Sequence, residues 1–590
     1  MKVYQVRKAN YTNQLYSLNK KYNSISFFRL MAIVFFLVAL YYFVQTDKNY
    51  WGVLAFLSFA TFLILMRYHS TLLIQKQLLQ ALVEVNENEI AYLQREKIPF
   101  EEGSEFNDFN HPYSYDLDIF GTHSLFQNLN RTATFIGKKT LAERLTTILS
   151  NDEIEENQTA IQELSDQLDW RQEFLALAKV SQDTQSSYEN LLKWSVFNSK
   201  PIALVSRIIS FVLPALFIGF LVTYLVTFQS VYLTILSYLF VCNMAFMGLF
   251  FKRIQAEIAH TADIDKTIHQ YSLLLQKIES ETFTSKKLKD LQKKLMFEKV
   301  QASGHLKELS ELFSKMDTIA NLITASLFNG TVLYHFHVLY SLIAWKREHV
   351  KAIKNWLEVI GEFEMLNSVA NFSFNNPDFV YPKLNTQFEI TFSDLSHPLL
   401  NPITRIGNDI SFQPESFLIL TGSNMSGKST FLRSLGINMV LAGMGSPVCA
   451  AKANVHPLPV LVSMRLSDSL SDSESYFFAE IKRLKQIMDA LENQPAFVLL
   501  DEILRGTNSD DKRNGTIEVI KKVIAKKAIG AIATHDIEVC LTTNEYPNIL
   551  TNTCFEVEII ADELHFDYKL RNGICKNKSA TFLMKKMGVI

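Results

Sequence analysis

The sequence predicts a multidomain protein in which α-helical regions precede a C-terminal α/β domain, and three observations carry this prediction. Four long apolar runs form two closely spaced pairs in the first half of the chain. In the charged sequence around these runs, the apolar residues have the spacing of amphipathic helices. The last third of the sequence instead alternates short apolar strand patterns with helix patterns. At 590 residues the chain is also too long for one compact domain.

The first pair of runs predicts a transmembrane hairpin within an N-terminal unit, residues 1–70. Residues 27–44 and 51–66 carry a single charge, Arg29, and only residues 45–50 connect them. A helix rises about 1.5 Å per residue, so about 20 residues cross the hydrocarbon core of a bilayer. The first run reaches that length and the second is slightly short.

The second pair predicts another transmembrane hairpin, within residues 201–253. Its runs, 208–228 and 231–251, are joined by two residues, and Pro214 lies inside the first of them. Neighbouring helices can compensate for such a proline in lipid. The competing interpretation is four buried core helices of a soluble protein, but uncharged runs of this length and pairing are rare in soluble folds.

Basic residues predict the orientation of both hairpins. The connecting loops carry only Lys48, whereas many Lys and Arg residues flank the hairpins on their other side. They are Lys2, Arg7, Lys8, Lys20, Lys21, Arg67, Lys76, Lys200, Arg207, Lys252 and Arg253. By the positive-inside rule we expect a multi-pass protein of the plasma (inner) membrane with both termini and all large segments in the cytoplasm. The long polar lead argues against a cleavable signal.

The text between and after the hairpins predicts helical units at residues 71–200 and 254–375. A further apolar stretch, residues 320–345, contains Asn321, Asn329, His335 and His337. These polar residues favour a buried helix over a fifth span. The Asn- and Pro-rich residues 371–385 predict a linker to an α/β domain, residues 376–590.

A glycine-rich motif in this last domain predicts a phosphate-binding loop. The strand pattern of residues 417–420 leads into GSNMSGKS, which satisfies GxxxxGK[ST] in the context of a strand followed by a helix. Gly422 and Gly427 let backbone N–H groups turn toward phosphate oxygens, and the helix start adds its positive end. Lys428 is placed to reach the β- and γ-phosphates, and the Ser429 hydroxyl to bind Mg²⁺.

Two later strands end in residues that complete such a site. Residues 496–500 form an apolar strand followed by Asp501, a second Mg²⁺ anchor, and Glu502, a general base for the attacking water. Residues 531–533 form a third strand, and His535 after it is placed to sense the γ-phosphate. The competing interpretation is solvated acids and a structural histidine, which the glycine-rich motif upstream disfavours.

Charge and cysteine content exclude some classes of protein. The net charge is −2 with a pI near 6.7, so the whole chain has no general attraction for nucleic acid. The five cysteines are scattered without a CxxC pair, which disfavours a disulfide framework or a zinc site.

These motifs resemble the ATPase of the MutS family, which belongs to the ABC-type class. The segments are TGSNMSGKST (421–430), SESYFFAEIKRL (473–484), LLDEILRGTNSDD (499–511) and ATHD (533–536). Three residues depart from the family pattern: Ser423 stands where Pro is usual, and Ser473 and Leu504 stand where Gly is usual.

The resemblance extends upstream of the ATPase. Residues 124–164, and NRTATFIGKKTL (130–141) above all, are similar to the helical core domain of MutS. Residues 254–375 would then correspond to lever helices returning to that core. The family's N-terminal domain, which carries a Phe-x-Glu motif that wedges into mismatched DNA, is not recognisable in this sequence. The predicted first membrane hairpin stands in the corresponding N-terminal part of the chain.

The resemblance implies ATP and Mg²⁺ as cofactors, and a homodimer with composite sites. Ser475 of one subunit would meet the ATP of the other, and Arg405 stands where an aromatic residue often stacks on adenine. The implied nucleotide-binding residues are Arg405, Gly422, Ser423, Asn424, Met425, Ser426, Gly427, Lys428, Ser429, Thr430 and Ser475. Ser429 and Asp501 are the implied metal ligands, and Glu502 and His535 the catalytic residues.

The main functional hypothesis is a membrane-anchored ATPase whose conformational switch acts on an unknown protein or on the membrane. The alternative is recognition of mismatched DNA with ATP-dependent damage sensing. A transporter is disfavoured, because the predicted spans lack charged residues at mid-depth that would line a substrate path.

Overall fold

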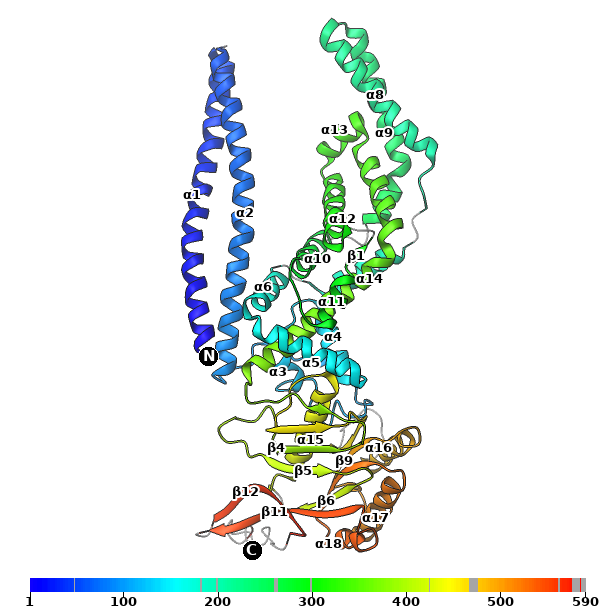
Figure 1. Cartoon of the computed structure of the whole chain (residues 1–590). Coiled ribbons are helices and arrows are strands. Elements are labelled where there is room, and N and C mark those ends of the chain that lie inside the picture. Colours follow the sequence, from blue (N-terminus) through cyan, green and yellow to red (C-terminus); the bar gives the residue numbers. More distant parts are fainter. Residues whose placement is uncertain are drawn as a thin grey trace.

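The structure is a computed structural model, and it describes part of the 590-residue chain. The described residues are 1–46, 48–180, 183–197, 200–258, 264–297, 300–423, 425–465, 476–560, 563–575 and 584. The molecule is elongated, with two helical hairpins pointing away from an α/β domain at the opposite end (Figure 1). A helical region lies between them, so the predicted combination of α and α/β parts is confirmed.

The first hairpin consists of α1 (Lys2–Thr46) and α2 (Asn49–Leu93). Each helix has 45 residues, roughly 67 Å at the helical rise, so it is much longer than a bilayer is thick. The apolar runs occupy the half nearer the tip, and the lower half of α2 packs on α6 (Leu168–Lys179). The expected unit boundary at residue 70 falls inside α2, because the helix continues without a break into this lower half.

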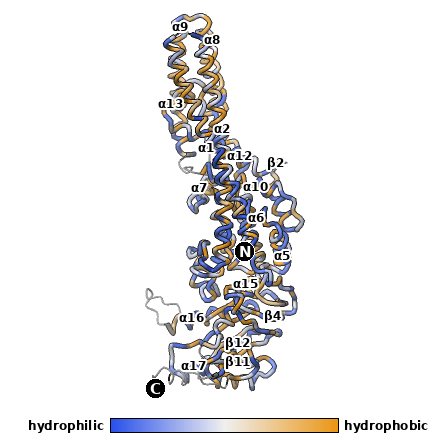
Figure 2. The backbone as a smooth tube through the Cα atoms, turned by 90° about the vertical axis from the view of Figure 1, so that its left-hand side faces the viewer, coloured by the Kyte–Doolittle hydropathy of each residue, from blue (hydrophilic) through white to orange (hydrophobic). Residues whose placement is uncertain are grey.

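The second hairpin consists of α8 (Leu204–Thr227) and α9 (Ser230–Ile258). Pro214 lies within α8 without ending it, and Phe228 closes that helix in a left-handed conformation, φ 55°. Hydrophobic residues, coloured orange in Figure 2, predominate along both helices of this hairpin. By length and composition, four helices of the described residues are able to cross a membrane, or up to five if one sharply bent pair is a single span.

A bundle of helices connects the hairpins to the α/β domain. Its core is α14 (Tyr334–Asn375), a 42-residue helix that packs on α4, α5 and α12. Helix starts follow local capping; for example, Thr134 Oγ1 accepts a hydrogen bond from Gly137 N at 3.1 Å. The other elements are η1 (Ser104–Phe106), α3 (Leu125–Leu129), α4 (Phe135–Thr146), α5 (Asn151–Asp166), α7 (Gln185–Val196), α10 (Ile264–Glu279), α11 (Lys286–Lys293), β1 (Met296–Phe297), β2 (Val300–Gln301), α12 (Ala302–Asp317), η2 (Thr318–Ala320) and α13 (Leu322–Val332).

The apolar stretch at residues 320–345 is not the single buried helix that its polar residues predicted. It is broken at Leu333, φ 51°, into α13 and the start of α14, which meet at 84°. Large apolar side chains of α13 are exposed, Ile323 to 82%. The break is stabilised by Asn329, whose Oδ1 accepts a hydrogen bond from His335 N at 3.0 Å. Asn329 and His335 are buried as expected, but they stabilise a helix corner rather than one continuous helix.

The linker prediction for residues 371–385 is wrong at its N-terminal end, because α14 continues through Asn375. Asn371 and Asn375 can lie within the helix because their side-chain amides are hydrogen-bonded to a buried carboxylate. Asn371 Nδ2 and Asn375 Nδ2 each donate a hydrogen bond to Glu89 of α2, both at 2.9 Å. The connection outside secondary structure is limited to residues 376–382.

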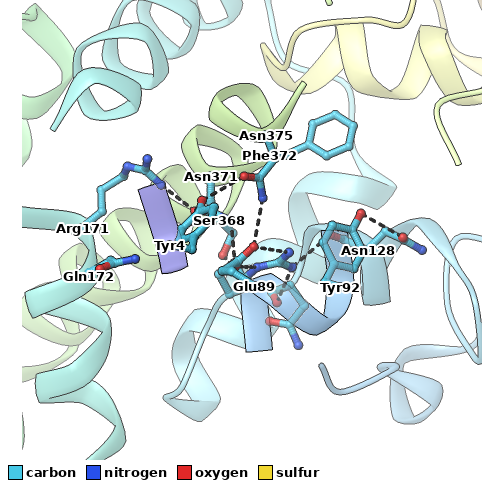
Figure 3. A network of polar contacts seen from close by, with 12 residues as sticks. Tyr4, Glu89, Tyr92, Asn128, Arg171, Gln172, Ser368, Asn371, Phe372 and Asn375 are labelled. Atoms are coloured by element: carbon cyan, nitrogen blue, oxygen red, sulfur yellow. Dashed lines mark hydrogen bonds and ion pairs between the residues drawn. The ribbon is translucent and has the colours of Figure 1, made fainter. Parts of the chain in front are cut away.

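Glu89 is the centre of a buried polar network that fastens the first hairpin to the bundle (Figure 3). Its carboxylate forms an ion pair with Arg131, and both side chains are almost fully buried. Tyr4 of α1 donates a hydrogen bond to Asn375 Oδ1 at 2.8 Å, and Arg171 of α6 donates one to Asn371 Oδ1 at 2.9 Å. Four helices thus meet at this point.

The α/β domain contains two sheets. The four-stranded sheet has the order β3-β7-β4-β5, and the six-stranded sheet the order β12-β11-β6-β10-β9-β8. In the larger sheet β8, β9, β10, β6 and β11 are parallel, and β12 is antiparallel to β11. Strands β6, β9 and β10 are buried throughout, as expected for a parallel sheet covered by helices.

The strands expected at residues 417–420, 496–500 and 531–533 are present as β6, β9 and β10, among the fifteen described elements of this domain. These elements are β3 (Lys383–Leu384), β4 (Ile390–Leu395), β5 (Asn408–Phe412), β6 (Phe417–Gly422), α15 (Lys428–Met444), β7 (Lys452–Val455), β8 (Val460–Ser463), α16 (Tyr476–Ala490), β9 (Phe497–Asp501), α17 (Ser509–Ala525), β10 (Ile529–Ala533), α18 (Ile537–Cys540), η3 (Leu541–Asn544), β11 (Leu550–Ile560) and β12 (Glu563–Asn572).

Candidate nucleotide-binding site

The glycine-rich loop lies between β6 and α15, at the carboxyl edge of the parallel strands. Gly427 has φ 100°, a left-handed conformation that favours glycine, and α15 begins directly after it at Lys428. The N-terminus of this 17-residue helix presents unpaired N–H groups and positive potential. Both features suit an anion.

Lys428 is buried at the base of the loop. Its Nζ donates hydrogen bonds to the carbonyls of Gly422 at 2.9 Å and Ser423 at 3.0 Å, and lies 3.3 Å from His535 Nε2. Burial lowers the pKa of Lys428, while the nearby carboxylates of Glu502 and Asp501 oppose that shift. The ammonium is thus held beside the loop by acceptors on two sides.

Ser429 and Asp501 come together as the sequence predicted, although β10 separates their strands. Ser429 Oγ donates a hydrogen bond to Asp501 Oδ2 at 2.6 Å. Burial raises the pKa of Asp501, and its second oxygen, Oδ1, is buried without a hydrogen-bond partner. A hydroxyl and a carboxylate with a spare lone pair form a donor set that Mg²⁺ prefers. The residues therefore fit the metal that the family resemblance implies.

Glu502 and His535 form a close pair next to Lys428. Glu502 Oε1 lies 2.5 Å from His535 Nε2, and this hydrogen bond is the main reason that the pKa of Glu502 is lowered to about 2. Glu502 has φ 48°, an unusual conformation for a non-glycine residue. The carboxylate is thus ionised at neutral pH and fixed in direction, as a general base requires.

A cavity of about 560 Å³ lies above the loop. Loop residues Met425 to Thr430 line one side, and the opposite side is formed by residues from β5, β12 and the loop before β5. The pocket includes Glu502, so the base and the loop open into the same space. Ser423 Oγ and Ser426 Oγ are buried without partners, which leaves donors for an anion.

Sequence reasoning missed Tyr568 of β12. Its ring lies against the loop, because a Cβ placed on Gly427 would be 3.1 Å from Tyr568 Cδ1, and it lines the cavity. Asn408 fixes its position: Asn408 Nδ2 donates to Tyr568 O at 3.0 Å, and Asn408 Oδ1 accepts from Leu570 N at 2.8 Å. No local motif marks this tyrosine, since β12 reaches the loop only through sheet pairing.

Arg405 also lines the cavity, but much of its guanidinium is used elsewhere. It forms an ion pair with Asp378, and its Cζ lies 5.1 Å from the centre of the Phe379 ring. Its Nη1 is buried without a hydrogen-bond partner. One nitrogen therefore remains for a ligand in the cavity.

Asn424 and Ser475, both predicted to bind nucleotide, lie outside the described residues. Glu480, in the same family segment as Ser475, is described and has a clear role. Its carboxylate accepts hydrogen bonds from Leu504 N at 2.7 Å and Arg505 N at 3.1 Å, so α16 holds the loop that follows β9. Leu504 has φ 61°, which explains why glycine is usual there in the family that the sequence resembles.

The known proteins that this chain resembles are MutS proteins. Residues 418–589 match the family MutS domain V. Human "MutS protein homolog 4" is 27% identical over 260 residues, which is 42% of this chain and 27% of the relative. The "DNA mismatch repair protein MutS" of Halothermothrix orenii is 30% identical over 236 residues, or 38% of this chain and 26% of that protein.

A third relative, the "DNA mismatch repair protein MutS" of Clostridium perfringens, is 31% identical over 187 residues, or 30% of this chain and 20% of that protein. The chain thus spans about a quarter of the length of the curated relatives it matches. Together with the domain match, these relatives show that part of the chain, including its C-terminal domain, is similar to proteins of the MutS family.

Proposed function

We propose that the α/β domain binds and hydrolyses ATP with Mg²⁺. The observation that carries this proposal is the meeting of Lys428, the Ser429–Asp501 pair and the Glu502–His535 pair at one edge of the parallel sheet. Lys428, Ser429 and Glu502 line the same cavity. Loop amides and Lys428 would hold the phosphates. Ser429 and Asp501 would hold Mg²⁺, which neutralises phosphate charge.

Glu502 is the proposed base for the attacking water, and His535 positions its carboxylate. The adenine would lie toward Tyr568 and Arg405, which line the same cavity as the glycine-rich loop. A tyrosine ring offers a stacking surface, and the remaining Arg405 nitrogen offers a hydrogen bond. The family resemblance further supports a homodimer in which Ser475 reaches the partner's nucleotide.

Nucleotide binding by a Lys428→Ala variant tests this proposal. Loss of the ammonium should reduce ATP affinity at least about 100-fold, since charge-assisted bonds to phosphate are among the strong ones. Lys452→Ala, an exposed lysine of β7, is the matched control and should bind ATP as the unaltered protein does. Unchanged affinity in Lys428→Ala would remove the phosphate assignment.

We further propose that both hairpins anchor the protein in a membrane, with the ATPase and both termini in the cytoplasm. Support comes from four helices that are long and apolar enough to span, from their exposed apolar side chains, and from tips that point the same way (Figure 1). Extraction of native membranes at alkaline pH tests this. A protein released into the supernatant would contradict membrane anchoring.

Recognition of mismatched DNA is the second candidate function. The relatives favour it over a membrane switch, since two of the three described above are DNA mismatch repair proteins. Filter binding with matched and mismatched duplexes over a salt series tests it, because phosphate contacts make affinity fall steeply with salt. Salt-sensitive binding with a preference for the mismatch would support this function, and no binding at low salt would exclude it.

A further inference from the structure

We propose that α13 is a re-entrant helix whose exposed face contacts lipid acyl chains beside the second hairpin. It would enter the membrane from the cytoplasmic side and leave on the same side through the bend at Leu333. The proposal rests on the membrane anchoring proposed above and adds a lipid-binding element that does not cross the bilayer.

The position of α13 along α9 sets its depth. Both views place α13 beside α9, below the tip of the hairpin (Figures 1 and 2). The ring of Phe240 packs on Gly330, where any Cβ would collide with it, and Asn243 Nδ2 donates a hydrogen bond to Gly330 O at 2.8 Å. These two α9 residues lie roughly 15–20 Å along the helix from the tip at Ser230, whereas the hydrocarbon core is about 30 Å thick. If α9 spans the membrane, α13 must therefore lie within it.

The surface of α13 has the character that this depth requires. The helix carries no charged residue, and four large apolar side chains are exposed. They are Leu322 (80%), Ile323 (82%), Leu327 (56%) and Phe328 (45%). The neighbouring helix α9 also exposes apolar side chains, among them Tyr238 (70%) and Val241 (62%). Lipid is the occupant that fits an uncharged apolar face beside a membrane span.

Polar groups near both ends of α13 are hydrogen-bonded, as burial in hydrocarbon demands. Asn321 Oδ1 accepts a hydrogen bond from Thr324 N at 3.2 Å and so caps the first turn. Asn329 is buried and accepts a hydrogen bond from His335 N across the bend. Asn243, a buried amide in mid-span, is explained as the group that binds the last turn of α13.

Fluorescence quenching in phosphatidylcholine–phosphatidylglycerol vesicles tests the proposal. Single cysteines would be introduced at Ile323 or Leu327, at Val222 of α8 as a hairpin reference, and at Asn355 of α14 as a water reference. The full chain would carry Cys242→Ala and Cys575→Ser, because the other three cysteines are buried. Each cysteine is labelled with bimane and quenched either by nitroxide lipids or by aqueous iodide.

We expect Ile323→Cys and Leu327→Cys to match Val222→Cys, with strong quenching by nitroxide lipids and several-fold weaker quenching by iodide than Asn355→Cys. If iodide quenches the labels on α13 while nitroxide lipids quench the label at Val222→Cys, the proposal is overturned and membrane anchoring is left intact. Protection from both quenchers would mean that protein covers α13, which also overturns it. Iodide quenching of Val222→Cys would remove anchoring and the proposal together.

Discussion

The carboxylate of Glu502 shows how the site uses pairs of residues rather than single ones. Its direction is set by His535, by its own left-handed backbone, and by Arg505, whose Nε donates a hydrogen bond to the carbonyl of Glu502 at 2.9 Å. Such positioning is what a general base needs in order to hold one water in line with a phosphate.

Glu502→Gln should bind ATP and hardly hydrolyse it. The amide preserves the shape of the side chain but takes no proton, so we expect turnover to fall roughly 100- to 10,000-fold. Nucleotide affinity should stay within about threefold, because Lys428 and the loop remain intact. Single-turnover measurements with labelled ATP give both quantities. Turnover equal to that of the unaltered protein would contradict the assignment of Glu502 as the base.

His535→Ala should change the pH dependence of hydrolysis. The hydrogen bond from His535 lowers the pKa of Glu502 to about 2, so the base stays ionised through the acid range. Without it the pKa of Glu502 should rise toward its usual value, and protonation would then remove activity as pH falls. We expect the acid limb of the pH–turnover profile to move to higher pH. An acid limb at the same pH in both proteins would contradict this role.

At the scale of elements, the joint between α2 and α14 is built around the buried carboxylate of Glu89. Arg131 and Glu89 are paired in an almost water-free site, and both asparagines near the end of α14 are bonded to the same carboxylate. A buried pair of this kind contributes specificity of docking more than net stability. It sets one arrangement of the hairpin against the bundle.

Glu89→Gln should loosen this joint, because the charge of Arg131 would remain buried without its counter-ion. Removing one partner of a buried pair costs about 3 kcal/mol. Hydrogen exchange of peptides that contain residues 371–375 measures the local loss of protection. Glu87→Gln is the control: its exposed pair with Lys8, at 3.0 Å, should contribute less than about 1 kcal/mol. Equal effects of the two changes would contradict the role given to the network.

At the scale of the whole molecule, residues 103–124 join the bundle to the nucleotide site. Asp116 is buried and accepts hydrogen bonds from Met464 N at 2.7 Å and Arg465 N at 2.9 Å, both just beyond β8. It also accepts one from Arg483 of α16 at 3.2 Å. Since Glu480 of the same helix holds the loop after β9, α16 connects this segment to the edge of the sheet that carries Glu502.

Asp116→Ala should uncouple the two parts. Three donors would lose their buried acceptor, and each unsatisfied group costs about 1–3 kcal/mol. We expect faster hydrogen exchange in α16 and a several-fold lower ATP turnover, with ATP affinity nearly unchanged. Glu105→Ala, an exposed residue of the same segment, should leave both properties as they are. Normal turnover together with normal protection of α16 in Asp116→Ala would contradict this coupling.

The sequence alone determined the features that depend on neighbouring residues. The glycine-rich loop, the acids after β9 and the histidine after β10 follow from local pattern, because parallel strands bring their carboxyl ends to one edge wherever they pair. The apolar pairs likewise predicted two hairpins, since length and hydropathy are properties of a continuous segment.

The tertiary structure alone decided what depends on distant partners. Tyr568 reaches Gly427 only through the pairing of β11 with β6, and residues 371–375 are helical because Glu89, almost 300 positions earlier, binds their amides. The corner at Leu333 has a local contact between Asn329 and His335, and its position against α9 is set by the distant residue Asn243. Local sequence cannot encode these outcomes by itself, because the contacts that stabilise them form only after the chain has folded.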